Sequence, residues 1–215
     1  MKHKKSAAML LCAAAAAGLL ITGCAKEPSQ TPDISPAASS VVSSSAPDTP
    51  DSPDSSENLA SQLGSLESFS AVTLEGESFT QDDIAAKDAT VINFWALTCR
   101  PCIAEMPDLA AFAGALPDNV QVITVCLDGA GNEETVQSVL DEAGFTGATL
   151  VGGDGDLVDL AWNVIYTPTT VCADSEGKLI GKTIIGGQRD LEGTLLTAVN
   201  EVLKDGGKAE ISLEA

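Results

Sequence analysis

The sequence predicts an α/β domain with a central mixed β-sheet flanked by helices. From Leu66 onward, apolar runs of strand length alternate with helical patterns. Near the end of the chain two strands are joined by a short turn, and a last helix follows. Strand–helix alternation favours parallel strands, whereas a hairpin adds an antiparallel pair. Together these observations predict a sheet with both kinds of pairing.

Each element follows from local pattern. Strands are expected at 91–95, 120–127, 148–151, 169–172 and 179–185, and helices at 101–116, 132–143, 156–162 and 190–203. Pro107 predicts a kink in the first helix, and Gly144 ends the second. The turn at 174–177 joins the hairpin strands. Residues 152–156 are interpreted as a turn entering a helix, not a calcium loop, because the EF-hand order of ligands is missing.

Residues 1–23 are typical of a secretory signal. Lysines at Lys2, Lys4 and Lys5 precede an apolar run at 7–21, which is shorter than the ~20 residues of a membrane-spanning helix. The small residues before Cys24 resemble a bacterial lipobox, which implies cleavage there and lipidation of the Cys24 thiol. An uncleaved membrane anchor is the alternative. Both interpretations place the rest of the chain outside the cytoplasm, tethered to a membrane.

The remaining chain divides into a linker, one domain and a tail. Residues 25–65 contain 12 Ser, 6 Pro and a single base, Lys26. Such a segment cannot bury enough apolar surface to offset its ordering entropy, so residues 24–65 are expected to be the lipidated cysteine and a disordered linker. The globular domain is expected at 66–204, and the Gly- and charge-rich residues 205–215 are expected to form a flexible tail.

Charge and histidine content exclude several functions. The 215 residues include 11 Lys+Arg, 31 Asp+Glu and one His, for a formal net charge of -20. His3 lies in the signal, so the processed protein has no histidine for Ser-His-Asp or Cys-His catalysis or for a His-ligated metal. The excess of acids argues against a nucleic-acid partner.

The chemistry centres on Cys99 and Cys102, which follow a strong strand and open a helix. This spacing places Cys99 at the helix start and Cys102 one turn in, on the same side. The positive helix end and Arg100 favour the Cys99 thiolate, and Pro101 suits the first helical turn. Cys99 is therefore expected to attack a substrate disulfide and Cys102 to resolve the mixed disulfide. Half of a zinc site and a structural disulfide are the alternatives.

With its flanking segments, the pair resembles the thioredoxin superfamily, and within it the TlpA/ResA group of membrane-anchored thiol–disulfide oxidoreductases. The resemblance covers about 69–203 and rests on residues 93–96 before the pair, the Cys-x-x-Glu-x-Pro pattern at 102–107, the segment 166–170 and the turn at 174–179. It implies a thioredoxin-like fold with an N-terminal β-hairpin extension and a central strand–helix insertion within 132–162.

The resemblance also implies roles for single residues. Pro168 would be the cis-proline that faces the cysteines, with Thr167 offering backbone hydrogen bonds to an extended substrate. Glu105 would take or relay the proton of Cys102, since Asn93 stands where thioredoxin has a buried aspartate and an amide cannot accept a proton. Trp95 would support the site. Thr98 replaces the usual tryptophan before the first cysteine, which leaves partner choice open.

The function expected from these residues is an extracytoplasmic thiol–disulfide oxidoreductase, a monomer with no metal and no cofactor beyond the Cys99–Cys102 pair. The resemblance implies client protein disulfides as substrates and a membrane thiol-electron donor of the CcdA/DsbD type. A redoxin-type thiol peroxidase and a non-enzymatic binding lipoprotein are the alternatives. Cys126 and Cys172 are expected to be buried free thiols on strands that flank the active-site strand, too far apart for a disulfide.

Overall fold

The structure is a computed structural model that describes residues 64–213. The predicted signal sequence, Cys24 and the predicted linker up to residue 63 lie outside the described residues. Within 64–213, no helix is long and apolar enough to cross a membrane.

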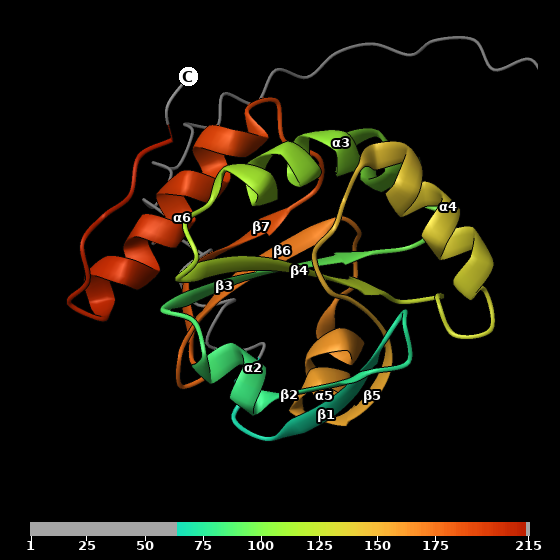
Figure 1. Cartoon of the computed structure of the whole chain (residues 1–215), viewed down its shortest axis with the longest axis horizontal. Coiled ribbons are helices and arrows are strands. Elements are labelled where there is room, and N and C mark those ends of the chain that lie inside the picture. The colour runs from blue at the N-terminus through green and yellow to red at the C-terminus, as the bar shows by residue number, and fades with distance from the viewer. Residues whose placement is uncertain (1–63, 214–215) are drawn as a thin grey trace, which may run out of the picture. The chain divides into compact units, whose positions relative to one another are not determined.

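A mixed sheet forms the centre of the described domain (Figure 1). Its strands are β1 (Phe69–Thr73), β2 (Ser78–Thr80), β3 (Ala89–Trp95), β4 (Val120–Cys126), β5 (Thr149–Gly155), β6 (Thr169–Asp174) and β7 (Leu179–Ile185). They lie in the order β2-β1-β5-β4-β3-β6-β7. The β3–β4 and β4–β5 pairs are parallel, and the other pairs are antiparallel. The predicted mixed sheet and the N-terminal hairpin, β1–β2, are confirmed.

Helices cover both faces of this sheet. They are α2 (Gln81–Ala85), α3 (Arg100–Ala115), α4 (Glu133–Ala143), α5 (Asp156–Asn163) and α6 (Leu191–Asp205). Figure 1 shows α3, α4 and α6 on one face and α2 and α5 on the other. All seven residues of β3 are buried, and its side chains alternate between the two layers. Val91 and Trp95 pack with α3 and α6, whereas Ile92 and Phe94 pack with α2 and α5.

Several helix boundaries match their sequence signals. Asn132 precedes α4, Glu133 and Glu134 occupy its first turn, and Gly144 ends it in the left-handed conformation with φ 73°. Helix α3 continues through Pro107 to Ala115. The central insertion is thus the α4–β5–α5 segment, as the resemblance implies.

The glycine-rich segment after Val151 is a strand, so its interpretation as a turn was wrong. Strand β5 extends to Gly155 because residues 152–155 pair with β1 of the N-terminal hairpin. The glycines permit this close approach, since a β-carbon at Gly153 would lie 2.8 Å from the Ser70 carbonyl oxygen. Asp154 accepts the Ser70 N–H at 3.1 Å. In the described part of the chain, no three His, Cys, Asp or Glu residues form a group that could hold a metal ion.

The segment after α6 folds back onto the domain. The sequence analysis expected a flexible tail there and did not predict these contacts. The side chain of Asn200 accepts the Ile211 N–H at 2.8 Å and donates to the Ile211 carbonyl oxygen at 3.0 Å. Ile211 and Leu213 pack against the core layer that contains α3 and α6. The Asn200 amide, this apolar packing and the ion pair between Lys208 and Asp88 at 2.7 Å together hold the segment despite its Gly- and charge-rich composition.

The close contact of β5 with β1 predicts different effects for two neighbouring glycines. Gly153→Ala should lower the free energy of unfolding by about 1–3 kcal/mol, because the new methyl group meets main-chain atoms of β1 that cannot turn aside. Gly152→Ala is the matched control, since a β-carbon there meets nothing within 4 Å. Urea unfolding of both variants measures the difference. Equal decreases in the free energy of unfolding for the two variants would show that β1 does not contact Gly153 closely.

Candidate active site

The two cysteines of the CxxC sequence form a disulfide at the start of α3. Their sulfurs are 2.03 Å apart and their α-carbons 5.3 Å apart. Cys99 is the N-cap of α3, and its Sγ accepts the main-chain N–H of Cys102 at 3.2 Å. Cys99 is half-buried, whereas Cys102 is buried. The predicted placement is confirmed, and Cys99 is the sulfur of the pair that a partner can reach.

The charges around this helix start favour a thiolate at Cys99 once the pair is reduced. Arg100 is the first residue of α3 and is exposed, and Pro101 stands in the first turn. No acidic residue lies in that turn. The free N–H groups of the helix start and the guanidinium both stabilise negative charge on the nearby sulfur.

Asp128 holds the loop between β3 and Cys99 through a hydrogen bond. The sequence analysis did not identify this residue. Its Oδ1 accepts the Leu97 N–H at 2.8 Å. The Leu127 N–H donates to the Trp95 carbonyl oxygen at 2.9 Å. Trp95 itself is fully buried, and its indole N–H has no hydrogen-bond partner among residues 64–213. The sequence contained one signal for this role of Asp128, namely an aspartate just beyond the end of β4, the strand that pairs with β3.

The segment before β6 brings a proline to the same end of the sheet. The Thr167–Pro168 peptide bond is cis, as the resemblance implies. Thr169 pairs with Phe94, so Pro168 lies beside the end of β3 from which the CxxC loop departs. Pro168 is buried and Thr167 half-buried. The Pro168 carbonyl oxygen accepts the Gly186 N–H at 2.8 Å, which ties this turn to the end of β7.

Glu105 is buried one helical turn after Cys102, with 9% of its surface exposed. Burial raises the pKa of its carboxyl to about 7, and repulsion from Asp108 acts in the same direction. Hydrogen bonding from the Asn93 side chain and the Gln188 main chain opposes this rise in pKa. One oxygen, Oε2, has no hydrogen-bond partner within the described residues. The carboxyl therefore changes protonation near neutral pH inside the protein.

Two further features position Glu105. The Asn93 side chain, which hydrogen-bonds to Glu105, also donates to Thr170 Oγ1 at 2.9 Å. This second bond ties Asn93 to β6, the strand after the cis-proline. The β7–α6 loop covers the carboxyl from the other side, since a β-carbon at Gly187 would lie 3.6 Å from Oε2 and 3.9 Å from Pro101. The sequence analysis identified Asn93 but not this loop. In the sequence, only the Gly186–Gly187 pair pointed to a close approach of the loop to another group.

The remaining described thiols are free and buried, as predicted. Cys126 lies opposite Trp95 on β4, and Cys172 lies opposite Val91 on β6, on the two sides of β3. Burial raises the pKa of each thiol to about 12, helped by Asp128 beside Cys126 and by Glu201 near Cys172. Both thiols therefore stay protonated when Cys99 is active.

The buried strand, the dithiol at the following helix start and the cis-proline beside it define a thioredoxin-like dithiol–disulfide protein. The chain belongs to the AhpC/TSA family, whose model matches residues 64–182.

Named relatives agree with this class. The chain is 32% identical over 110 residues to the thioredoxin-like protein YneN of Bacillus subtilis, covering 51% of this chain and 63% of YneN. It is 28% identical over 124 residues to the thiol-disulfide oxidoreductase ResA of Halalkalibacterium halodurans, covering 57% of this chain and 68% of ResA. The match therefore spans about two thirds of the length of these relatives.

The fold also matches solved structures. The thioredoxin domain of a thiol-disulfide oxidoreductase from Bacteroides vulgatus superposes with a TM-score of 0.52 at 24% identity. The match covers 64% of this chain and 97% of that domain. At this identity the similarity establishes the thioredoxin-like fold.

The buried carboxyl predicts a pH dependence of stability. Because the pKa of Glu105 rises from 4.5 to about 7 on folding, the folded state keeps a proton in this window that the unfolded state has lost. The contribution of Glu105 to stability therefore falls as pH rises from about 5 to about 8. In Glu105→Gln, urea unfolding of the oxidised protein should show this loss reduced by about 1–3 kcal/mol.

The control for this measurement is Glu134→Gln, which changes an exposed carboxylate on α4. That variant should keep the full pH dependence. A Glu105→Gln protein with the same loss of stability as the wild type would assign the titration to other groups.

Proposed function

We propose that the protein is an extracytoplasmic thiol–disulfide oxidoreductase that reduces disulfides in client proteins. The observation that carries this proposal is the position of Cys99, a half-buried sulfur at the N-terminus of α3 that accepts a main-chain N–H beside a second, buried cysteine. The names of the relatives, which include thiol-disulfide oxidoreductase, support the same reaction class.

In the first step the reduced Cys99 thiolate attacks one sulfur of a client disulfide. A bond forms between Cys99 Sγ and that sulfur, the client S–S bond breaks, and the second client sulfur leaves as a thiolate that takes a proton from water. The helix start and Arg100 lower the cost of the attacking thiolate. Thr167, next to Pro168, offers main-chain hydrogen bonds that hold the client segment extended across the site.

In the second step Cys102 resolves the mixed disulfide. Its thiol loses a proton to the Glu105 carboxylate, and the resulting thiolate attacks Cys99 Sγ. The Cys99–Cys102 bond forms and the client leaves as its second thiolate. The dithiol thereby gives two electrons to the client disulfide. Glu105 suits this step because its pKa of about 7 allows it to accept a proton near neutral pH.

The protein is proposed to work at a membrane surface, held through a lipid on Cys24 after removal of residues 1–23. A membrane thiol donor of the CcdA/DsbD type would return the pair to the dithiol state. Clients of the kinds that the resemblance implies are apocytochrome c, other exported disulfide proteins and a methionine sulfoxide reductase. No metal or organic cofactor takes part in this scheme, and a monomer suffices.

Trapping tests the proposal directly. Cys102→Ser removes the resolving thiol, so mixed disulfides between Cys99 and clients should accumulate in cells and disappear on treatment with a reductant. Cys99→Ser is the matched control and should capture no client. Failure of Cys102→Ser to capture any client, or full cellular activity of Cys99→Ser, would reject the mechanism and favour a binding lipoprotein. The reduction potential of the pair, measured with the same preparation, gives the direction of exchange.

A thiol peroxidase is the second candidate, because the matching family model is that of AhpC/TSA. Such an enzyme uses a peroxidatic cysteine in a Thr-x-x-Cys setting, whereas Ala96 precedes Cys99 at that spacing here. With the resolving thiol one turn away, dithiol exchange should dominate. Reduced protein should therefore react with a protein disulfide at least about tenfold faster than with hydrogen peroxide at equal concentration, an advantage of about 1.4 kcal/mol in barrier. Faster reaction with peroxide would reverse the assignment.

A further inference from the structure

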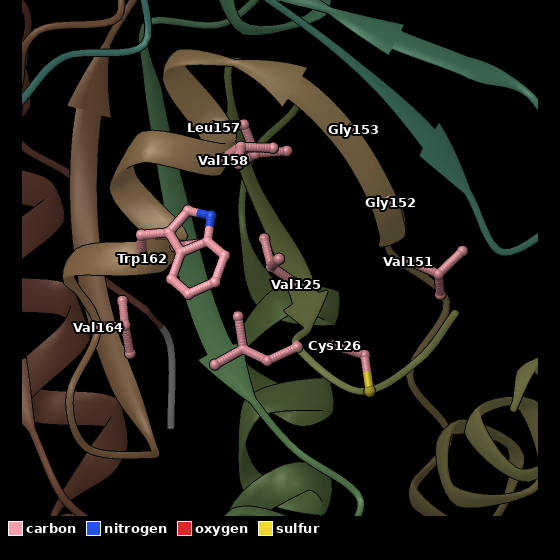
Figure 2. A pocket seen from close by; sticks show the side chains of 11 residues that line it. Val125, Cys126, Val151, Gly152, Gly153, Leu157, Val158, Trp162 and Val164 are labelled. Atoms are coloured by element: carbon pink, nitrogen blue, oxygen red, sulfur yellow. The ribbon is translucent and has the colours of Figure 1, made fainter. Parts of the chain in front are cut away.

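An apolar cleft of about 450 Å³ lies beside the proposed exchange site and has no part in the mechanism above. Figure 2 shows its two walls, with Trp162, Val158 and Val164 on one side and Val125, Cys126 and Val151 on the other. The first wall is α5 and the residue after it, and the second is formed by the end of β4 and by β5. The cleft thus lies between the central insertion and the end of β4.

Two segments connect the cleft to the disulfide. Cys126 on the cleft wall lies opposite Trp95, and Asp128 holds the loop that leads to Cys99. On the other wall, the chain runs from Val164 directly to the cis peptide bond at Pro168. Cys99 follows Trp95 by only four residues, so the cleft lies within about 20 Å of the disulfide. An extended segment of about six residues spans that distance.

The cleft exposes apolar surface that the fold does not require. Trp162 is 83% exposed and Leu127 is 40% exposed, and both line the cleft. A volume of about 450 Å³ falls in the lower part of the ~300–1,000 Å³ range of pockets that bury small ligands. That volume suits one or two apolar side chains of a bound segment.

The charge around the cleft favours one kind of segment. Asp159 is exposed on α5 and lies one helical turn before Trp162, and Asp128 follows Leu127. The chain has no Lys or Arg between Arg100 and Lys178, a stretch that includes every residue of the cleft. An occupant with basic residues beside its apolar side chain therefore complements both the lining and the rim.

We propose that this cleft binds the client polypeptide itself, taking an aromatic or branched aliphatic side chain that lies within about six residues of the client cystine and is flanked by Lys or Arg. The proposal rests on the oxidoreductase function and adds a specificity to it. The aromatic surface that Thr98 does not supply beside Cys99 is supplied instead by Trp162, on the insertion.

The apolar part is tested with synthetic peptides that contain one disulfide and carry either Phe or Ser about four positions from a cysteine, on either side. Wild-type reduced protein should reduce the Phe peptide with a kcat/KM about tenfold higher than that for the Ser peptide, mainly through KM. Trp162→Ala should remove most of this preference. Tyr166→Ala, which removes an exposed aromatic outside the cleft, should keep it. Equal rates for the two peptides in the wild type, or loss of the preference in Tyr166→Ala alone, would overturn the proposal.

The charge part uses two substitutions that change the net charge equally. Asp159→Lys lies one helical turn before the cleft residue Trp162, whereas Asp118→Lys lies just before β4, at the end of that strand opposite the cleft. Asp159→Lys should lower kcat/KM several-fold for a Phe peptide with Lys beside the Phe, and less for the same peptide with Glu, at low ionic strength. Asp118→Lys should change neither. Equal effects of the two substitutions would show a response to overall charge and reject the cleft.

A small symmetric disulfide, 2-hydroxyethyl disulfide, separates this proposal from the function on which it rests. Because it has no side chain to place in the cleft, all four variants should reduce it at the wild-type rate. If the wild type fails to reduce it and the peptides, the oxidoreductase function is wrong. If the wild type reduces both peptides equally while retaining this reaction, only the cleft proposal is wrong.

Discussion

The hydrogen bond from the Cys102 N–H to Cys99 Sγ, 3.2 Å long, is the interaction on which the site depends. It exists because Cys99 is the N-cap of α3, and α3 is fixed by Met106, Leu109 and Phe112 in the core. The fully buried strand β3 delivers the chain to that helix start. A sulfur at this position receives free main-chain N–H groups and the positive helix end, so its charged form is stabilised by backbone geometry.

Burial then assigns different protonation behaviour to the other titratable groups near β3. The pKa of Glu105 lies at about 7, while the pKa of each free thiol rises to about 12. A carboxyl can exchange a proton near neutral pH, and the two free thiols cannot compete with the pair. The only histidine of the sequence, His3, lies outside the described residues, so Glu105 is the group that we propose for the proton transfer that an imidazole performs in many enzymes. Asn93 and the Gly187 loop hold it there.

The sequence predicted the features of the fold and site that depend on local pattern. Strand–helix alternation predicted the mixed sheet, and the spacing of Cys99 and Cys102 predicted their places on α3. Sequence reasoning misjudged the segment 152–155, because pairing with β1 converts glycines that favour a turn into a strand. It missed Asp128 and the loop over Glu105, since both act through contacts between residues distant in sequence. The cleft was likewise not predicted, because its walls come from segments that are distant in sequence, the end of β4 and the α5 region.

The most direct test of the central claim is the pKa of Cys99 in the reduced protein. In Cys102→Ser with Cys12 and Cys24 also replaced by Ser, the ultraviolet absorbance of the thiolate follows Cys99, because Cys126 and Cys172 titrate only at about 12. Stabilisation of the thiolate by the helix start and Arg100 predicts a pKa for Cys99 clearly below the ~8.5 of a free cysteine. A value at or above ~8.5 would mean that the helix start and Arg100 do not activate the sulfur, and it would contradict the account.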